Sequence, residues 1–115
     1  MTPNPRPEAE GQPIVEWVPF QLTDGVTEDE LLSASRALQD EFLAKQPGFV
    51  RHELLRSGEE WADVVYWESR EAAERAVQQA AESSVCHRYF QLMHGTNHTN
   101  PGAGVRYYER RVSYG

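Results

Sequence analysis

The order of apolar patterns along this chain predicts one α+β domain, in which an antiparallel sheet carries helices on one face. Two long segments have apolar residues at the spacing of a helix, and four have the β-branched and aromatic residues typical of strands. These segments follow one another in the order β-α-β-β-α-β. A chain of 115 residues, of which 39% are hydrophobic and 25% are charged, has the size and composition of one globular domain.

Four strands are expected, at residues 14–22, 49–56, 61–68 and 105–112. The second and third strands are joined by a hairpin loop, Ser57-Gly58-Glu59-Glu60. Pro19 lies within the first strand. Because proline cannot donate a hydrogen bond to a sheet, we expect a bulge or an unpaired position at this residue.

Two helices are expected between the strands. Thr27 and Glu30 match the capping-box pattern, so the first helix should begin after Thr27. It should end before Pro47, because the residue that precedes a proline resists the α conformation. Ser69 is expected to cap the second, alanine-rich helix, and the spacing of apolar residues over 86–93 indicates one or two further helical turns. Four strands with two helices gathered on one face form the ferredoxin-like split βαββαβ arrangement.

The domain boundaries follow from a shift in composition near the N-terminus. Residues 1–13 hold four of the seven prolines, together with Glu8, Glu10 and Gly11. Such a segment cannot bury enough apolar surface to offset the entropy lost on ordering. We therefore expect residues 1–13 to be a flexible tail and residues 14–115 to form the folded domain.

Charge and hydropathy argue against several classes of partner. The formal net charge of −7 opposes binding to nucleic acid, and no apolar run approaches the roughly 20 residues that span a membrane. Cys86 is the single cysteine, so an intrachain disulfide is impossible and a reducing compartment fits. The first residues lack the apolar core of a signal peptide. These observations favour a cytoplasmic protein.

Both faces of the predicted sheet carry apolar residues. In the third strand Trp61 and Trp67 share one face, while Val64 and Tyr66 lie on the other. Two helices can cover only one face of a four-stranded sheet, and an exposed apolar face of that size is unusual for a monomer. The sequence therefore predicts a homodimer in which the two sheets face each other across a two-fold axis. A monomer with an apolar open sheet is the alternative.

Three motifs at the ends of the predicted strands and helices match a known family. They are Pro47-Gly48-Phe49, Trp61-x-Asp63-x-x-x-Trp67-x-Ser69 and Ser83-Ser84-x-x-x-x-x-Phe90. In these motifs the chain resembles the antibiotic-biosynthesis-monooxygenase-like (ABM-like) proteins of the dimeric α+β barrel superfamily, over residues 14–112. The resemblance implies a homodimer with a pocket between the sheet and the helices of each subunit.

The resemblance also implies an activity. Catalytic members of this family oxidise flat polyphenolic or quinol-like substrates with O₂, without a metal or a flavin. The chain is therefore expected to be a cofactor-independent oxygenase-like enzyme that acts on a small aromatic or polyketide-like substrate. Because the superfamily also hosts other activities and members with none assigned, a non-catalytic protein that binds a small apolar molecule is the alternative.

Such an oxidation needs a base that removes a proton and aromatic walls that orient a flat ring. The candidate proton acceptors are His52, His87 and Asp63. Histidine titrates in a useful range, and an acid within a strand requires a compensating partner. For Asp63, a salt bridge with Arg51 or Arg56 is the simpler account. The candidate substrate-binding residues, which can equally be core or interface aromatics, are Trp17, Trp61, Tyr66, Trp67, Tyr89 and Phe90.

No metal and no cofactor is expected. His94 and His98 are four residues apart, but the glycine-rich and polar residues around them favour a loop, in which the two imidazoles do not share a face. The family that the chain resembles includes haem-degrading proteins, which use an asparagine on the first strand and a histidine on the second helix. Neither residue is present at the corresponding places in this sequence.

Overall fold

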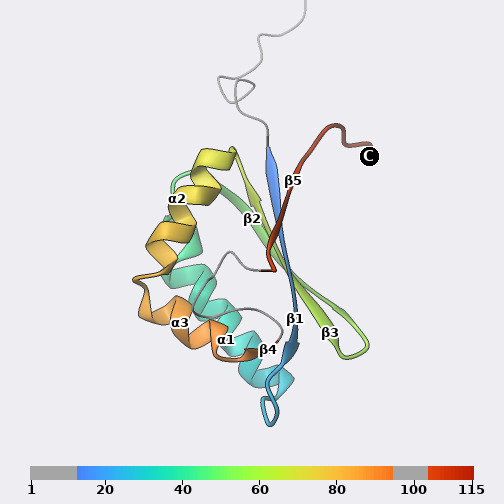
Figure 1. Ribbon diagram of the computed structural model, residues 1–115, viewed down its shortest axis with the longest axis vertical. Coiled ribbons are helices and arrows are strands. Elements are labelled where there is room, and N and C mark those ends of the chain that lie inside the picture. Colours follow the sequence, from blue (N-terminus) through green and yellow to red (C-terminus); the bar gives the residue numbers. More distant parts are fainter. Residues whose placement is uncertain (1–12, 95–103) are drawn as a thin grey trace, which may run out of the picture.

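Three helices lie on one face of an open antiparallel sheet in the computed structural model, which describes residues 13–94 and 104–115 (Figure 1). In chain order the elements are β1 (Ile14–Leu22), α1 (Glu28–Glu41), the 3-10 turn η2 (Leu43–Lys45), β2 (Phe49–Ser57), β3 (Glu60–Trp67), α2 (Arg70–Ala80), α3 (Ser84–Phe90), β4 (Met93–His94) and β5 (Arg106–Glu109). The expected tail falls on residues 1–13, so all of it except Pro13 lies outside the described residues.

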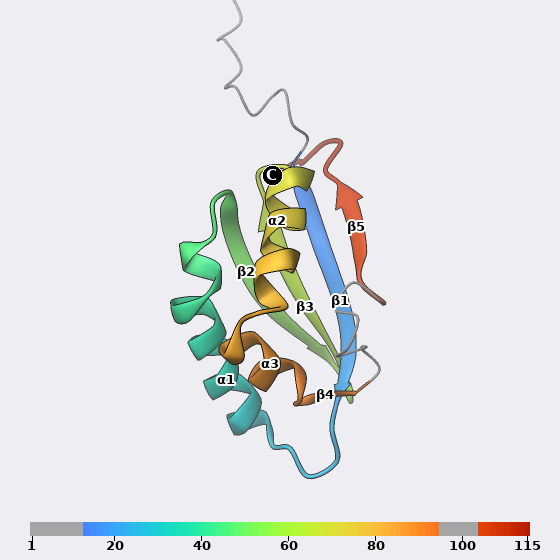
Figure 2. The ribbon, with the colours of Figure 1, turned by 60° about the vertical axis from the view of Figure 1, so that its left-hand side comes forward.

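Strand β1 is the centre of the sheet. It pairs with β3 along one edge, and β3 pairs in turn with β2. Its other edge is shared by β5, over residues 14–17, and by β4, over residues 21–22. Figure 2 shows this order, with β1 between β3 and β5. This is the strand order of the ferredoxin-like arrangement, so the predicted fold class is confirmed.

The structure differs from the sequence prediction in its smallest elements. Met93 was expected at the end of a helical segment, but it lies in the short strand β4 and pairs with Leu22 of β1. In the part of the chain that the structure describes, the sheet therefore has five strands instead of four, and α3 is a third helix. The last strand covers four residues, fewer than the eight predicted. A two-residue strand is too short to produce a recognisable alternation of apolar and polar residues.

Pro19 causes no bulge. The register between β1 and β3 runs without a shift from Ile14↔Trp67 to Phe20↔Trp61, and Pro19 lies opposite Ala62. On its other side, Pro19 falls between the residues of β1 that pair with β5 and those that pair with β4. No described strand occupies that position, so the missing N–H of proline interrupts no pairing there.

Capping residues fix the ends of the helices. The hydroxyl of Thr27 accepts a hydrogen bond from the Glu30 amide at 3.1 Å, and the Glu30 carboxylate accepts from the Thr27 amide at 2.9 Å. This confirms the predicted capping box. Ser69 caps α2, and Gly48 lets that helix approach the start of β2. A side-chain carbon added at Gly48 would lie 2.5 Å from the Cβ of Ala72, and Gly48 has a positive φ of 82°.

The hydrophobic core lies between the sheet and the helices. Leu31 and Leu38 of α1 and Ala73 and Ala76 of α2 are buried against residues of the sheet that include Trp67. The small alanine side chains of α2 allow this helix to lie close to the strands. In the part of the chain that is described, no helix is long and apolar enough to cross a membrane.

On the opposite face of the sheet, which we call the helix-free face, residues 13–94 and 104–115 place no helix. Ala62 and Val64 are buried there between larger side chains, while Leu55 and Tyr108 are 45% and 48% exposed. The face also holds a polar group that the sequence pattern did not indicate. Tyr66 donates a hydrogen bond to Glu53 at 3.1 Å, and Arg51 forms an ion pair with Glu53 at 2.6 Å. The helix-free face is thus apolar in the middle and charged beside it, which suits contact with a second copy.

We predict that this face makes the protein a homodimer. Light scattering at micromolar concentration should give twice the chain mass of 13.1 kDa. Leu55→Glu places a charge on the helix-free face and should produce a monomer. The matched change Leu32→Glu alters a leucine of similar exposure, 46%, on helix α1 and should leave the dimer intact. A wild-type protein that stays monomeric would contradict this prediction.

Candidate functional site

A cavity of about 70 Å³ remains between the sheet and the three helices. Its walls are mostly apolar. The lining residues with a functional group are Glu16, Asp63, Trp67 and Cys86, and Phe90 of α3 adds an aromatic wall. Glu16 lies on β1 and Asp63 on β3, so the two central strands each contribute a carboxyl group. Two carboxyl groups that face an otherwise apolar cavity indicate a functional site.

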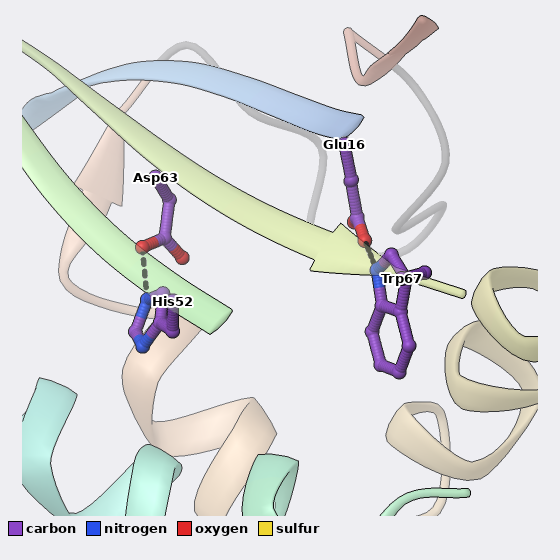
Figure 3. A network of polar contacts seen from close by, with 4 residues as sticks. All are labelled: Glu16, His52, Asp63 and Trp67. Atoms are coloured by element: carbon purple, nitrogen blue, oxygen red, sulfur yellow. Dashed lines mark hydrogen bonds and ion pairs between the residues drawn. The ribbon is translucent and has the colours of Figure 1, made fainter. Parts of the chain in front are cut away.

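Asp63 pairs with His52. The imidazole Nε2 lies 2.5 Å from Asp63 Oδ1, and each side chain is only 6% exposed (Figure 3). In the register of the sheet, His52 lies opposite Val65 and Leu54 lies opposite Asp63, so His52 and Asp63 are diagonal neighbours on one face. This buried pair satisfies a carboxylate whose isolation in the core would be costly.

The expected arginine partners of Asp63 form other ion pairs, which corrects the simpler account of this residue. Arg51 lies on the helix-free face and pairs with Glu53. Arg56, near the end of β2, reaches Glu28 at the start of α1 at 3.0 Å. Neighbouring residues of a strand point to opposite faces, so Arg51 cannot meet an acid that faces the helices.

Glu16 is held by Trp67. The indole Nε1 donates a hydrogen bond to Glu16 Oε1 at 2.8 Å, between strands β1 and β3 (Figure 3). Burial raises the pKa of Glu16 from 4.5 to about 7. The hydrogen bond from Trp67 lowers this pKa, the negative charge of Asp63 raises it, and His52 lowers it. Glu16 can therefore exchange a proton near neutral pH, which is the property required of an acid–base group.

Tyr89 lies behind the cavity on helix α3. It is fully buried, and its hydroxyl has no hydrogen-bond partner among the described residues. Burial raises the pKa of Tyr89 well above its ordinary value of 10, and the charge of Asp63 raises it further. The Tyr89 hydroxyl therefore stays protonated and adds no charge beside Asp63.

The structure brings together some of the predicted site residues. His52 and Asp63 are in contact, and Asp63, Trp67 and Phe90 line the cavity. Tyr89 belongs to the buried core next to Phe90, with ring centroids 6.3 Å apart.

The other predicted residues lie elsewhere. His87 is exposed on the outer side of α3, and its Nε2 lies 2.8 Å from the carbonyl oxygen of Ala81. Trp17 and Tyr66 alternate with Glu16 and Trp67, so they lie on the helix-free face of the sheet. Trp61 faces the helices, but it stacks on Phe20 and does not line the cavity.

Glu16 is the residue that sequence reasoning missed. The sequence pattern that drew attention to Asp63, an acid within a strand between two apolar residues, also occurs at Glu16, which lies between Val15 and Trp17. Cys86 was also not singled out as a lining residue. Burial raises the pKa of its thiol to about 11, so this group is protonated and unreactive at neutral pH.

The described residues do not form a metal or haem site. Over residues 13–94 and 104–115, no three His, Cys, Asp or Glu side chains gather as metal ligands. His98 of the motif considered above lies outside this part of the chain. For haem, the described lining of the cavity holds no imidazole, and Cys86 is a protonated thiol. The donor set therefore does not suit an axial ligand of haem iron.

Comparison with known proteins identifies the fold. No protein-family model and no curated protein matches the sequence. Among solved structures, SnoaB from Streptomyces nogalater, a cofactor-independent oxygenase, superposes with a TM-score of 0.70 and 21% identity, over 90% of this chain and 97% of SnoaB. A candidate antibiotic biosynthesis monooxygenase from Nitrosomonas europaea superposes with a TM-score of 0.62 and 16% identity, over 91% and 96% of the two chains.

MhuD, solved with two manganese protoporphyrin IX molecules per active site, is a third similar structure. Its TM-score is 0.62 and its identity 22%, over 89% of this chain and 98% of MhuD. At these identities the likeness establishes the fold alone. The chain has the fold of the ABM-like proteins, as the sequence motifs implied.

We predict that the His52–Asp63 pair contributes strongly to stability. Asp63→Ala should lower the free energy of unfolding by about 3 kcal/mol or more, because it leaves a buried imidazole without its partner. Arg111→Ala breaks an ion pair whose side chains are 75% and 48% exposed, and it should cost less than about 1 kcal/mol. Urea unfolding at one fixed protein concentration measures both. Equal, small losses for the two variants would refute this role.

Proposed function

We propose that this protein is a cofactor-independent oxygenase-like enzyme that acts on a small aromatic or polyketide-like substrate between the sheet and the helices. One observation carries the proposal: Glu16 and Asp63 face the same, otherwise apolar cavity. A protein that only stores an apolar molecule has no use for buried ionisable groups, whose burial costs free energy. A base for proton transfer does require such a group.

The chemistry needs no external reductant. An anthrone, which has a methylene group next to aromatic rings, illustrates it. A base removes one proton to give an electron-rich anion, and the anion transfers electrons to O₂ and forms a C–O bond. Loss of water from the resulting hydroperoxide leaves a carbonyl. The balance is CH₂ + O₂ → C=O + H₂O, so the methylene carbon supplies all the electrons that O₂ accepts.

The cavity offers what this reaction requires. The apolar walls exclude water, which strengthens electrostatic interactions with the substrate anion. The indole of Trp67 and the ring of Phe90 provide flat surfaces against which an aromatic ring can lie. His52 contacts Oδ1 of Asp63 and holds this carboxyl group in place beside the cavity. The fold shared with SnoaB, a cofactor-independent oxygenase, supports the proposed oxygenase-like function.

The size of the cavity constrains how a substrate enters. About 70 Å³ is well below the roughly 300 Å³ of a small-molecule pocket, so several side chains must move when a ring binds. Val77 and Phe90 are the partly buried members of the lining on α2 and α3. We expect these two to shift, because fully buried neighbours are held by more contacts.

We predict that the protein consumes O₂ when it is given anthrones or hydroquinones. Uptake should exceed the uncatalysed autoxidation rate for at least one compound of the panel. Val77→Phe fills the cavity and should abolish the excess uptake. His87→Ala changes an exposed histidine of the neighbouring helix and should leave it unchanged. An oxygen electrode measures all three proteins, and circular dichroism checks that each variant is folded.

The alternative function has its own signature in the same experiment. If no compound is consumed above the autoxidation rate but some bind, the protein is a non-catalytic small-molecule-binding protein. Binding is followed through the fluorescence of Trp67, which lines the cavity, with Trp67→Phe as the reference for the other two tryptophans.

A further inference from the structure

We propose that Glu16 is the residue that accepts the proton of the substrate, and that the Trp67 indole holds its carboxylate in place. This inference rests on the proposed function and names the residue that performs its first step. The predicted acceptors from the sequence were His52, His87 and Asp63, so the structure points to a different residue.

The lining of the cavity leaves few groups that can take a proton. Among the described lining residues, only Glu16, Asp63 and Cys86 have one. The Cys86 thiol has a pKa near 11, so it is already protonated at neutral pH. Asp63 forms a buried pair with the His52 imidazole through Oδ1, at 2.5 Å, and a proton placed on this carboxylate would weaken the pair. The partner of Glu16 is a neutral indole, so a proton on Glu16 disrupts no such pair. His52 itself stands behind Asp63 and is not part of the lining.

Glu16 keeps one oxygen available. Trp67 donates to Oε1, and among the described residues it is the one hydrogen-bond donor to this carboxylate. The other oxygen, Oε2, can therefore receive a proton. A carboxylic acid still accepts a hydrogen bond at its carbonyl oxygen, so the contact with Trp67 persists after the proton arrives. The indole thus fixes the position of the group in both protonation states.

The surroundings of Glu16 suit a base at neutral pH. Its pKa near 7 arises chiefly from burial, and Asp63 raises it further. His52 and the Trp67 N–H act in the opposite direction. From β5, Tyr107 lies directly opposite Glu16, and Arg70 of α2 lies over the Tyr107 ring. A group with this pKa is deprotonated in half of the molecules at pH 7 and still binds a proton readily.

The proton can also be returned. Glu16 becomes a carboxylic acid when it takes the proton from the substrate. Addition of O₂ to the substrate anion gives a peroxide anion, which needs a proton on its outer oxygen to become the hydroperoxide. Glu16 can supply that proton and recover its negative charge. The hydroperoxide then loses its remaining C–H hydrogen together with the outer OH group as water, so no net proton is gained or lost by the protein over one turnover.

The decisive variant is Glu16→Gln, which keeps the size of the side chain and an oxygen that accepts from Trp67. It should lower kcat for the best substrate of the panel by about 100-fold or more. The variant should fold well. Because the pKa of Glu16 is raised on folding, wild type loses stability as the pH rises from about 4.5 to about 7, and glutamine avoids this loss.

Glu53→Gln is the matched control. Glu53 is also a strand glutamate that accepts a hydrogen bond from an aromatic side chain, Tyr66, at 3.1 Å, but it lies on the other face of the sheet. It should retain wild-type kcat, with light scattering as a check on its mass. If Glu16→Gln also retains wild-type kcat while wild type is active, Glu16 is not the base and the proposed function stands. An inactive wild type contradicts both.

The pH profile separates Glu16 from the His52–Asp63 pair. For wild type, kcat should rise with pH through about 7, because the carboxylate is the active form. Trp67→Phe removes a hydrogen bond that lowers this pKa, so the midpoint should move to higher pH. His52→Ala should lower kcat, and because His52 also lowers the pKa of Glu16, the profile should keep its single rise with a midpoint at higher pH. A midpoint unmoved by Trp67→Phe would assign the titration to another group.

Discussion

The register between β1 and β3 is the constraint on which the rest of the structure depends. It places Glu16 opposite Val65 and Val18 opposite Asp63, so both acids face the helices. A slip by one residue would turn Trp17 inward and send Glu16 to the other face. The hairpin between β2 and β3, with its positive φ of 65° at Gly58, fixes the second register and brings His52 to Asp63.

Much of the fold could be predicted because its signals are local. The apolar residues of β1, the Thr27–Glu30 capping box and the Ser69 cap each act within a few residues, and the structure contains all three. The short strand β4 had no such signal. Met93 and His94 form a strand only because the end of β1 lies beside them, which is a property of the folded chain.

The candidate site was harder to predict because its contacts join different strands. Asp63 could be recognised as an acid that needs a partner, but the partner depends on which strand residues share its face. The same limit applied to Trp17 and Tyr66, which are aromatic residues of central strands and nevertheless lie opposite the cavity. Glu16 carried the same local signal as Asp63, and its proximity to Trp67 emerges only from the pairing of β1 with β3.

The site has a cost that the rest of the core must offset. Burying Glu16 disfavours its charged form, and the two acids repel each other across the cavity. Apolar residues in the same places would pack at lower cost. Stability around this region comes from alanine-rich α2, from the buried aromatics of β3 and from the helix caps Thr27, Ser69 and Ser83, the last of which accepts a hydrogen bond from the Cys86 amide at the start of α3. A core that keeps unfavourable groups at one cavity has the form expected when those groups serve a reaction.

The central claim is that Glu16 titrates near neutral pH inside this cavity, and NMR measures that most directly. The ¹³C shift of its side-chain carboxyl, assigned by the signal that Glu16→Gln removes, should change with a midpoint near pH 7. The same midpoint is expected when no substrate is present. A midpoint near 4.5, the ordinary value for glutamate, would contradict the account.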